Sequence, residues 1–258
     1  MRAIHFFKHL LNTKTKYSVH SPFVFDFFTQ VLEGKKSAIG ADIETLRKKL
    51  CRSSLIVEYE DLGAGRGNNQ PKLVQRSIGE IARNSARTRM EGEFLYRLCK
   101  HYQPQRCLEL GTNLGISTLY QLRALGNSQF ISLEGASVLF DMAQTHIHQF
   151  GLEADLRVGE FGELLDKLDL AQLSPDYVFI DGNHRYEATM EYFYRFLPHI
   201  AEGGLMIFDD IYWSAGMVKA WQEIIQQPEV SVSIDLFFFG LCFIRRKQQK
   251  EHFRFVLK

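Results

Sequence analysis

The chain has 258 residues, enough for one large α/β domain or for a domain with a helical extension. Hydrophobic residues make up 45% of it and charged residues 24%, as in ordinary globular proteins, and no run of about 18 apolar residues could span a membrane. The N-terminal stretch lacks the apolar core of a secretion signal, and the four cysteines show no metal-ligand spacing. We therefore expect reduced thiols and a cytoplasmic location.

The charge is unevenly distributed, although the net charge is only +1. Residues 1–90 carry 16 Lys and Arg against 8 Asp and Glu, whereas residues 91–258 carry 15 against 22. A basic front segment favours a large anionic partner such as a nucleic acid. Attraction between the two parts of the chain explains the same pattern, and both readings stay open.

The first 89 residues read as a helical, basic extension. Short amphipathic helices are expected over 1–12, 22–33 and 41–52, and the polar stretch 66–90 has no strand signal. The helix at 22–33 is dense in phenylalanine, which favours packing against the main domain or a homodimer interface over a substrate site.

From residue 90 onward the sequence predicts a second unit, a domain over 90–258 in which strands and helices alternate. Strands are expected at 106–110, 129–135, 154–160, 176–182, 203–210, 230–237 and 238–246, with helices at 92–102, 116–126, 137–151, 161–169, 186–200 and 214–226. This alternation is typical of βαβ units with right-handed crossovers. The predicted fold is a Rossmann-like α/β sheet of seven mostly parallel strands, with one antiparallel edge strand and helices on both faces.

Two glycine-rich turns compete for the role of ligand site. "LELGTNLG" (108–115) follows a predicted strand, precedes a predicted helix and is followed by Glu134, which closes the next strand 23 residues after Gly111. "DLGAG" (61–65) is followed by a polar, proline-containing stretch instead. We therefore place the site at 109–115 and interpret "DLGAG" as a surface turn.

The spacing of this turn also indicates its ligand. Gly111 and Gly115 do not form the G-x-G-x-x-G pattern that seats a pyrophosphate, which argues against an NAD-dependent oxidoreductase, and Glu109 precedes the first glycine by two positions. Carboxylates suit a cationic ligand without phosphate, such as S-adenosylmethionine. Glu134 would then accept hydrogen bonds from both ribose hydroxyls, and Gly111 would let the backbone approach the methionine part.

Residues 90–246 resemble the class I S-adenosylmethionine-dependent methyltransferases, and among them the catechol- and caffeoyl-CoA-type O-methyltransferases. Four segments carry the resemblance in the family's order. They are "MEGEFLYRLC" (90–99), "CLELGTNLGIST" (107–118), "SLEGA" (132–136) and "VFIDGNHRYE" together with "GGLMIFDDIYW" (178–187 and 203–213).

The resemblance implies a set of site residues. Cofactor contacts fall on Met90, Gly92, Glu109, Gly111, Thr112, Asn113, Gly115, Ser117, Glu134, Gly135, Glu160, Phe161 and Asp181. The family's divalent metal, Mg²⁺ or another cation, falls on Asp181, Asp209 and Asp210, with Asp210 in place of an asparagine. The family's catalytic lysine corresponds to His184.

The catalytic roles have structural alternatives. His184, together with Asp181, would take the proton of the acceptor, because imidazole titrates near neutrality; it could equally be a solvated histidine at a helix entry. Asp209 and Asp210 hold a metal or cap the helix near Ser214. Tyr186 and Trp213 line an acceptor pocket or only pack.

The sequence thus predicts S-adenosylmethionine-dependent O-methyl transfer to a small-molecule hydroxyl, with metal assistance as an option. Two alternatives stay open. One is a methyltransferase acting on an RNA base or another anionic acceptor, and the other is a protein that binds the cofactor without turnover.

Overall fold

The computed structural model describes residues 2–34, 39–61 and 72–257. Residues 62–65 of the "DLGAG" segment lie outside this part, so its interpretation as a surface turn stays a prediction. No helix in the described ranges is long and apolar enough to cross a membrane.

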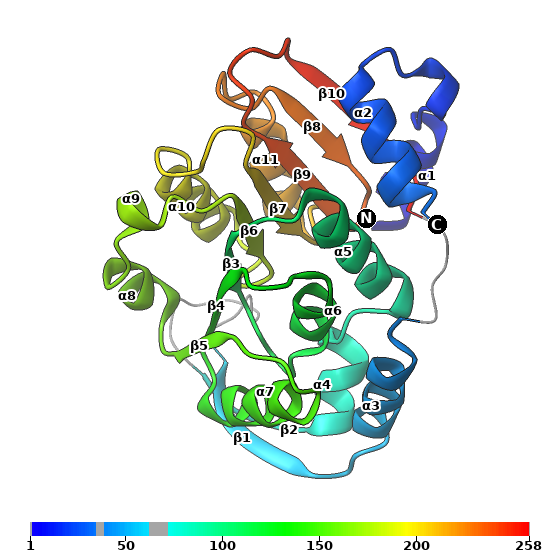
Figure 1. The fold of residues 1–258 in the computed structure, drawn as a ribbon. Coiled ribbons are helices and arrows are strands. Elements are labelled where there is room, and N and C mark those ends of the chain that lie inside the picture. Colours follow the sequence, from blue (N-terminus) through cyan, green and yellow to red (C-terminus); the bar gives the residue numbers. More distant parts are fainter. Residues whose placement is uncertain (1, 35–38, 62–71, 258) are drawn as a thin grey trace.

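A central eight-stranded sheet organises the chain in the order β10-β8-β9-β7-β6-β3-β4-β5 (Figure 1). The strands are β3 (Arg106–Leu110), β4 (Gln129–Glu134), β5 (Asp155–Val158), β6 (Tyr177–Ile180), β7 (Leu205–Asp209), β8 (Val232–Asp235), β9 (Phe239–Phe243) and β10 (Glu251–Arg254). The neighbouring strands β5, β4, β3, β6 and β7 pair in parallel, so the carboxyl ends of β3, β4, β6 and β7 lie at one edge of the sheet. Ligands of open α/β sheets bind at such an edge.

The Rossmann-like fold is confirmed, but the predicted count of seven strands is wrong. β10 is the eighth strand, and it pairs in parallel with β8 at the edge of the sheet. The antiparallel strand β9 is consequently not an edge strand, because it pairs with both β7 and β8. A short strand at the edge of a sheet is only partly buried, so it needs few apolar residues. The sequence "EHFR" of β10 accordingly lacks the alternation of apolar and polar residues that would predict a strand.

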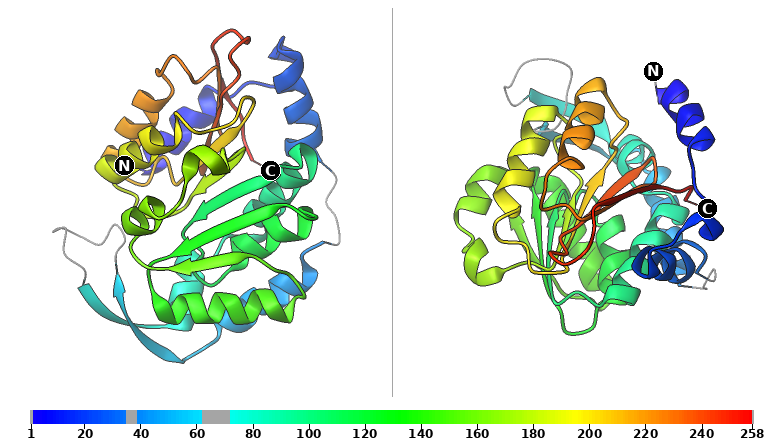
Figure 2. Two further views of the ribbon diagram at one scale, coloured as in Figure 1. Left: turned by 60° about the vertical axis from the view of Figure 1, so that its left-hand side comes forward. Right: turned by 90° about the horizontal axis from the view of Figure 1, so that it is seen from above.

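Helices cover both faces of the sheet (Figures 1 and 2). α5 (Arg89–Tyr102), α6 (Ile116–Ala124) and α7 (Ser137–Gln149) contribute Leu95, Leu119 and Leu139 to one buried cluster. α8 (Phe161–Asp166), α9 (Leu170–Leu173), α10 (Tyr186–Phe196) and α11 (Ala215–Ile224) belong to the other face, where Phe193 and Trp221 are buried.

The N-terminal segment is not purely helical, contrary to the sequence-based expectation. It contains α1 (Arg2–Leu11), a short 3-10 turn (Lys16–Ser18), α2 (Pro22–Phe27) continued by a π-helix (Phe28–Leu32), α3 (Ala41–Cys51) and α4 (Ile78–Ser85). Between α3 and α4, β1 (Ile56–Asp61) and β2 (Lys72–Ser77) form an antiparallel pair. A two-stranded sheet buries little of its surface, so β2 can carry basic side chains. Its sequence therefore lacks the apolar pattern that would predict a strand.

The aromatic residues of α2 and the following π-helix pack against the C-terminal strands. Phe23 meets Phe243 edge to face at 4.9 Å, and Phe28 meets Phe255 at the same centroid distance. The N-terminal segment therefore shares the core of the main sheet, as one of the two sequence interpretations expected. A domain boundary at residue 89 stays a prediction, although α5 does begin at Arg89.

Candidate functional site

The glycine-rich turn joins β3 to α6 through backbone conformations that require glycine. Gly111 has a φ of +100°, and a Cβ there would lie 2.1 Å from the carbonyl oxygen of Asp181. Gly115, with a φ of +79°, precedes the first residue of α6. The turn can therefore sit directly against the end of β6 and open onto the N-terminus of α6, whose free N–H groups face the same edge.

Glu134 lies beside this turn at the end of β4. Its Oε2 accepts a hydrogen bond from the Asn113 backbone nitrogen at 2.6 Å, and its Oε1 accepts one from Ala136 at 2.9 Å. Burial raises the pKa of Glu134 above its usual value. Each carboxylate oxygen has a second lone pair, so the side chain is fixed in place and can still accept hydrogen bonds from a ligand.

Glu109 has a different environment, because it is fully buried beneath the turn. Its Oε2 accepts from Thr118 at 2.6 Å and Ser132 at 2.7 Å, while Oε1 accepts from Gln121 at 2.7 Å and Ser117 at 3.3 Å. Burial raises its pKa to about 7, against the opposing effect of these hydrogen bonds. Glu109 thus ties β3, β4 and α6 together, and this role can explain its place in the sequence pattern without a direct cofactor contact.

Several other predicted cofactor residues also have internal partners. Thr112 Oγ1 lies 2.5 Å from Ser132 Oγ, and Ser117 donates its hydroxyl hydrogen to Glu109. Gly92 lies against the ring of Tyr120, where an added Cβ would come within 2.3 Å of the ring. These contacts belong to the packing below and behind the turn, and direct contact of the three residues with a cofactor stays a prediction.

The remaining predicted cofactor residues border the same region. Glu160 accepts a hydrogen bond from the Glu163 backbone and caps α8, and the ring of Phe161 covers Gly182 at the end of β6. Met90 is half-buried against the core, and Gly135 follows Glu134 directly. Their contact with a cofactor stays a prediction.

The ends of β6 and β7 bring Asp181 and Asp209 together with His184. One donor atom of each lies within 4.8 Å of the others, which is close enough to share a metal ion. The His184 Nε2 is 3.7 Å from Asp181 Oδ1 and 3.8 Å from Asp209 Oδ2. The group of three contains His184 and not Asp210, whose backbone has a left-handed φ of +50°. The predicted metal role of Asp210 stays untested.

Arg87 lies at these two aspartates, and the sequence reasoning missed it. Its guanidinium bonds both oxygens of Asp181, from Nη2 at 2.6 Å and from Nε at 3.2 Å, and Nη2 also donates to Asp209 Oδ2. Glu91 lies 4.0 Å from Nη1, and the guanidinium carbon is 5.7 Å from the Phe239 ring centroid. The only sequence signal was indirect: acidic residues end two neighbouring strands, and buried carboxylates require a cation.

The charges in this group shift one another's pKa values in opposite directions. Burial raises the pKa of Asp209 well above its usual range. Burial acts in the same sense on Asp181, but the electrostatic effects of the Arg87 guanidinium and of the neighbouring His184 outweigh it and hold the pKa of Asp181 below its usual value. The two carboxylates therefore behave unequally, with Asp181 as the more firmly ionised one.

The space beside the turn is small in this structure. A cavity of about 10 Å³ is lined by residues 85–87, by residues 112–114, 116 and 117 of the turn, and by Asp181. This is about the space that a single water molecule needs. The cavity between residues 85–87 and the turn is therefore too small for a ligand of nucleoside size.

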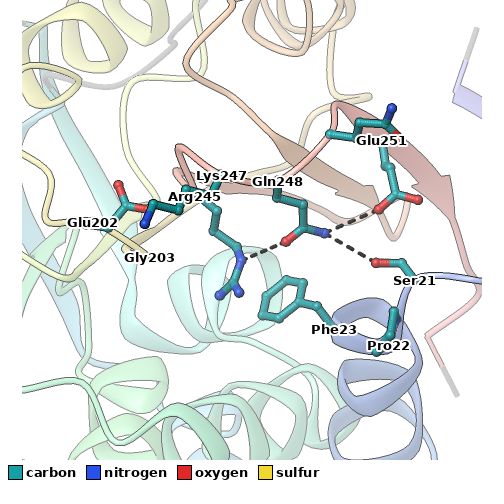
Figure 3. A pocket seen from close by; sticks show the side chains of 10 residues that line it. Ser21, Pro22, Phe23, Glu202, Gly203, Arg245, Lys247, Gln248 and Glu251 are labelled. Carbon is teal, nitrogen blue, oxygen red and sulfur yellow. Dashed lines mark hydrogen bonds between the residues drawn. The ribbon is translucent and has the colours of Figure 1, made fainter.

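A larger hollow of about 870 Å³ lies near the opposite end of β7 (Figure 3). Figure 3 shows Arg245 bonded to Gln248, which reaches Ser21 and Glu251. This hollow contains none of the residues predicted for the site.

The two aromatic residues near the acceptor side differ in exposure. Tyr186 donates its hydroxyl hydrogen to Glu223 at 2.6 Å and lies under the Lys219 ammonium, so it packs against α11. Trp213 is 54% exposed. Of the two, Trp213 is the exposed one.

The chain thus has a Rossmann-like sheet with Glu134 held beside the glycine turn. Asp181, Asp209 and His184 lie together at the neighbouring strand ends. Residues 108–211 match the family described as a methyltransferase domain. The predicted resemblance to class I S-adenosylmethionine-dependent O-methyltransferases is confirmed.

Curated relatives match part of the chain. The chain is 33% identical over 125 residues to a catechol O-methyltransferase of Niastella koreensis, a match that covers 47% of this chain and 56% of the relative. The chain spans about half the length of the curated relatives it matches.

Two solved structures are similar in fold. The O-methyltransferase from Bacillus cereus in complex with SAH has a TM-score of 0.58 at 17% identity, covering 86% of this chain and 97% of that one. The O-methyltransferase TomG from Streptomyces achromogenes, in complex with SAM, has a TM-score of 0.55 at 20% identity over 63% of this chain and 82% of that one. At these identities the likeness establishes the fold.

Proposed function

We propose that the chain is an S-adenosylmethionine-dependent methyltransferase that methylates a hydroxyl oxygen of a small molecule. The observation that carries the proposal is the position of Glu134, held by two backbone N–H groups beside the turn of Gly111. A carboxylate held in place in this way can still accept hydrogen bonds, which suits a ribose diol. The acidic pair Asp181–Asp209 lies at the neighbouring strand ends, where a methyl acceptor would stand.

The transfer itself requires positioning and the removal of one proton. The acceptor oxygen attacks the methyl carbon, the carbon–sulfur bond breaks, and the sulfonium becomes the neutral thioether of S-adenosylhomocysteine. His184 takes the hydroxyl proton on an imidazole nitrogen, and the nearby Asp181 stabilises the imidazolium that results. A divalent cation, when bound at this edge, would lower the pKa of the acceptor hydroxyl.

The acceptor is taken to be a small molecule, with catechol as the first candidate because a matched relative is a catechol O-methyltransferase. An RNA acceptor has weaker support. Basic side chains of the N-terminal segment pair with acidic neighbours, namely Lys16 with Glu33, Arg47 with Glu44 and Arg89 with Glu93. Their charge is therefore partly neutralised within the chain.

Two further parts of the proposal concern the setting of the protein. A homodimer and a cytoplasmic location stay predictions. The exposed side chains of Phe7 and Leu11 on α1 are one apolar surface at which a second copy could pack.

The test is transfer of a labelled methyl group from S-adenosylmethionine to catechol, with an unmodified tRNA as a second acceptor. We expect label on catechol, its loss in Glu134→Ala, and its retention in Glu153→Ala, an exposed control. Label on the RNA alone would favour the nucleic-acid alternative. Cofactor binding without label on any acceptor would favour a protein that binds without turnover.

A further inference from the structure

We infer that the guanidinium of Arg87 is the resident cation of the Asp181–Asp209 pair, and that a divalent ion must displace it to bind there. The relevance of this inference to catalysis rests on the proposed function, because the aspartate pair borders the proposed acceptor site. It concerns Arg87, which lies outside every sequence pattern that suggested the site.

The first step is the match between the guanidinium and the carboxylates. Arg87 bonds Asp181 through two nitrogens and Asp209 through one, and its side chain is only 11% exposed. The planar guanidinium of arginine is well suited to donate two parallel hydrogen bonds to a carboxylate. Three of the four oxygens of the pair thus have a cationic partner.

The second step is the donor set. Asp181, His184 and Asp209 offer atoms close enough together for one divalent ion. The oxygens that lie nearest His184 Nε2, Asp181 Oδ1 and Asp209 Oδ2, are the same oxygens that Arg87 Nη2 contacts. A divalent ion and the guanidinium therefore cannot both use these two oxygens at full strength.

The third step is an incompletely satisfied atom. Oδ1 of Asp209 is buried and has no hydrogen-bond partner in the described part of the chain. Leaving a carboxylate oxygen buried without a partner is energetically unfavourable. The guanidinium thus neutralises the pair without saturating it, which distinguishes this group from a completed structural salt bridge.

The fourth step is the location of Arg87 in the chain. It lies in the short connection between α4 and α5, and residues 85–87 also line the cavity beside the cofactor turn. A movement that takes Arg87 away from the aspartates would therefore also enlarge the space at the turn. Cation exchange and access to the cofactor turn are coupled through this one connection.

The test is Mn²⁺ binding to the purified full chain without cofactor, measured by the loss of the free-ion electron paramagnetic resonance signal. Arg87→Ala removes the guanidinium, and we expect its Mn²⁺ affinity to rise at least about tenfold over the unmodified chain. Asp209→Asn in the same background should abolish the gain. Arg89→Ala, which removes a more exposed arginine two residues away, should leave the affinity unchanged.

Equal Mn²⁺ affinity in the unmodified chain and in Arg87→Ala would overturn the inference, because the guanidinium would then not compete with the ion. Should Arg87→Ala fail to fold, Arg87→Gln is judged by the same criterion, since it removes the charge and keeps a polar side chain. Titration of the unmodified chain with S-adenosylhomocysteine is run separately. Failure of that titration would count against the proposed function and would leave the Mn²⁺ result standing.

Discussion

Glu109 makes a pH-dependent contribution to stability that can be worked out from its surroundings. Burial raises the pKa of Glu109 from 4.5 to about 7 in the folded chain. A raised folded-state pKa means that the stabilising contribution is fully present below the unfolded value of 4.5 and is lost as the pH rises through about 7. At about 1.36 kcal/mol per pH unit, the full difference corresponds to roughly 3 kcal/mol of unfolding free energy.

Glu109→Gln should remove this dependence while keeping the hydrogen bonds. The amide oxygen can accept from Gln121 and Ser117, and the amide nitrogen can donate to the hydroxyl oxygens of Thr118 and Ser132. Relative to the unmodified chain, the variant should therefore gain about 2–3 kcal/mol between pH 5 and pH 8. Urea unfolding followed by circular dichroism at three pH values measures the gain, and a difference between the two proteins that does not change with pH would refute the reasoning.

Three further variants test the glycine turn, the packing around Gly92 and the role of His184. Gly111→Ala should lower the free energy of unfolding by at least about 2 kcal/mol and abolish binding of S-adenosylhomocysteine, because residue 111 has a positive φ and a Cβ there would clash with the Asp181 carbonyl. Gly126→Ala is the control in the same unfolding and binding experiments, since a Cβ at residue 126 has no neighbour within 4 Å. Gly92→Ala should cost about 1–3 kcal/mol in urea unfolding through overpacking against Tyr120, and a loss of cofactor affinity in the folded variant would show a direct contact instead. His184→Asn should lower kcat for methyl transfer by roughly 100-fold or more with unchanged affinity for S-adenosylhomocysteine in calorimetry, and an unchanged kcat would exclude it as the base.

The central parallel strands could be predicted because β3, β4, β6 and β7 are largely apolar runs that end at, or just before, a glycine or an acid. The segments "RCLEL" and "QFISLE" have their predicted positions as β3 and β4, since central parallel strands are buried on both faces. β2 and β10 were missed for the opposite reason. Their residues "KLVQRS" and "EHFR" are largely polar, and only backbone pairing with a neighbour identifies them as strands.

The site shows a similar division between local and long-range information. The conformations of Gly111 and Gly115 follow from the local spacing of the turn, as does the place of Glu134 at the end of the next strand. The partners of Ser117 and Gly92 depend on which helix packs where, and the sequence spacing holds no such information. Arg87 is 94 residues from Asp181 in the chain, so their contact forms only through the tertiary fold.

Calorimetric titration of the purified chain with S-adenosylhomocysteine tests the central claim most directly. We expect micromolar binding that weakens at least about 100-fold in Glu134→Ala, since two hydrogen bonds to a charged acceptor contribute roughly 1.5–3 kcal/mol each, and that is unchanged in Glu153→Ala. Absence of binding to the unmodified chain, with and without Mg²⁺, would contradict the assignment of the turn at 109–115 as a cofactor site.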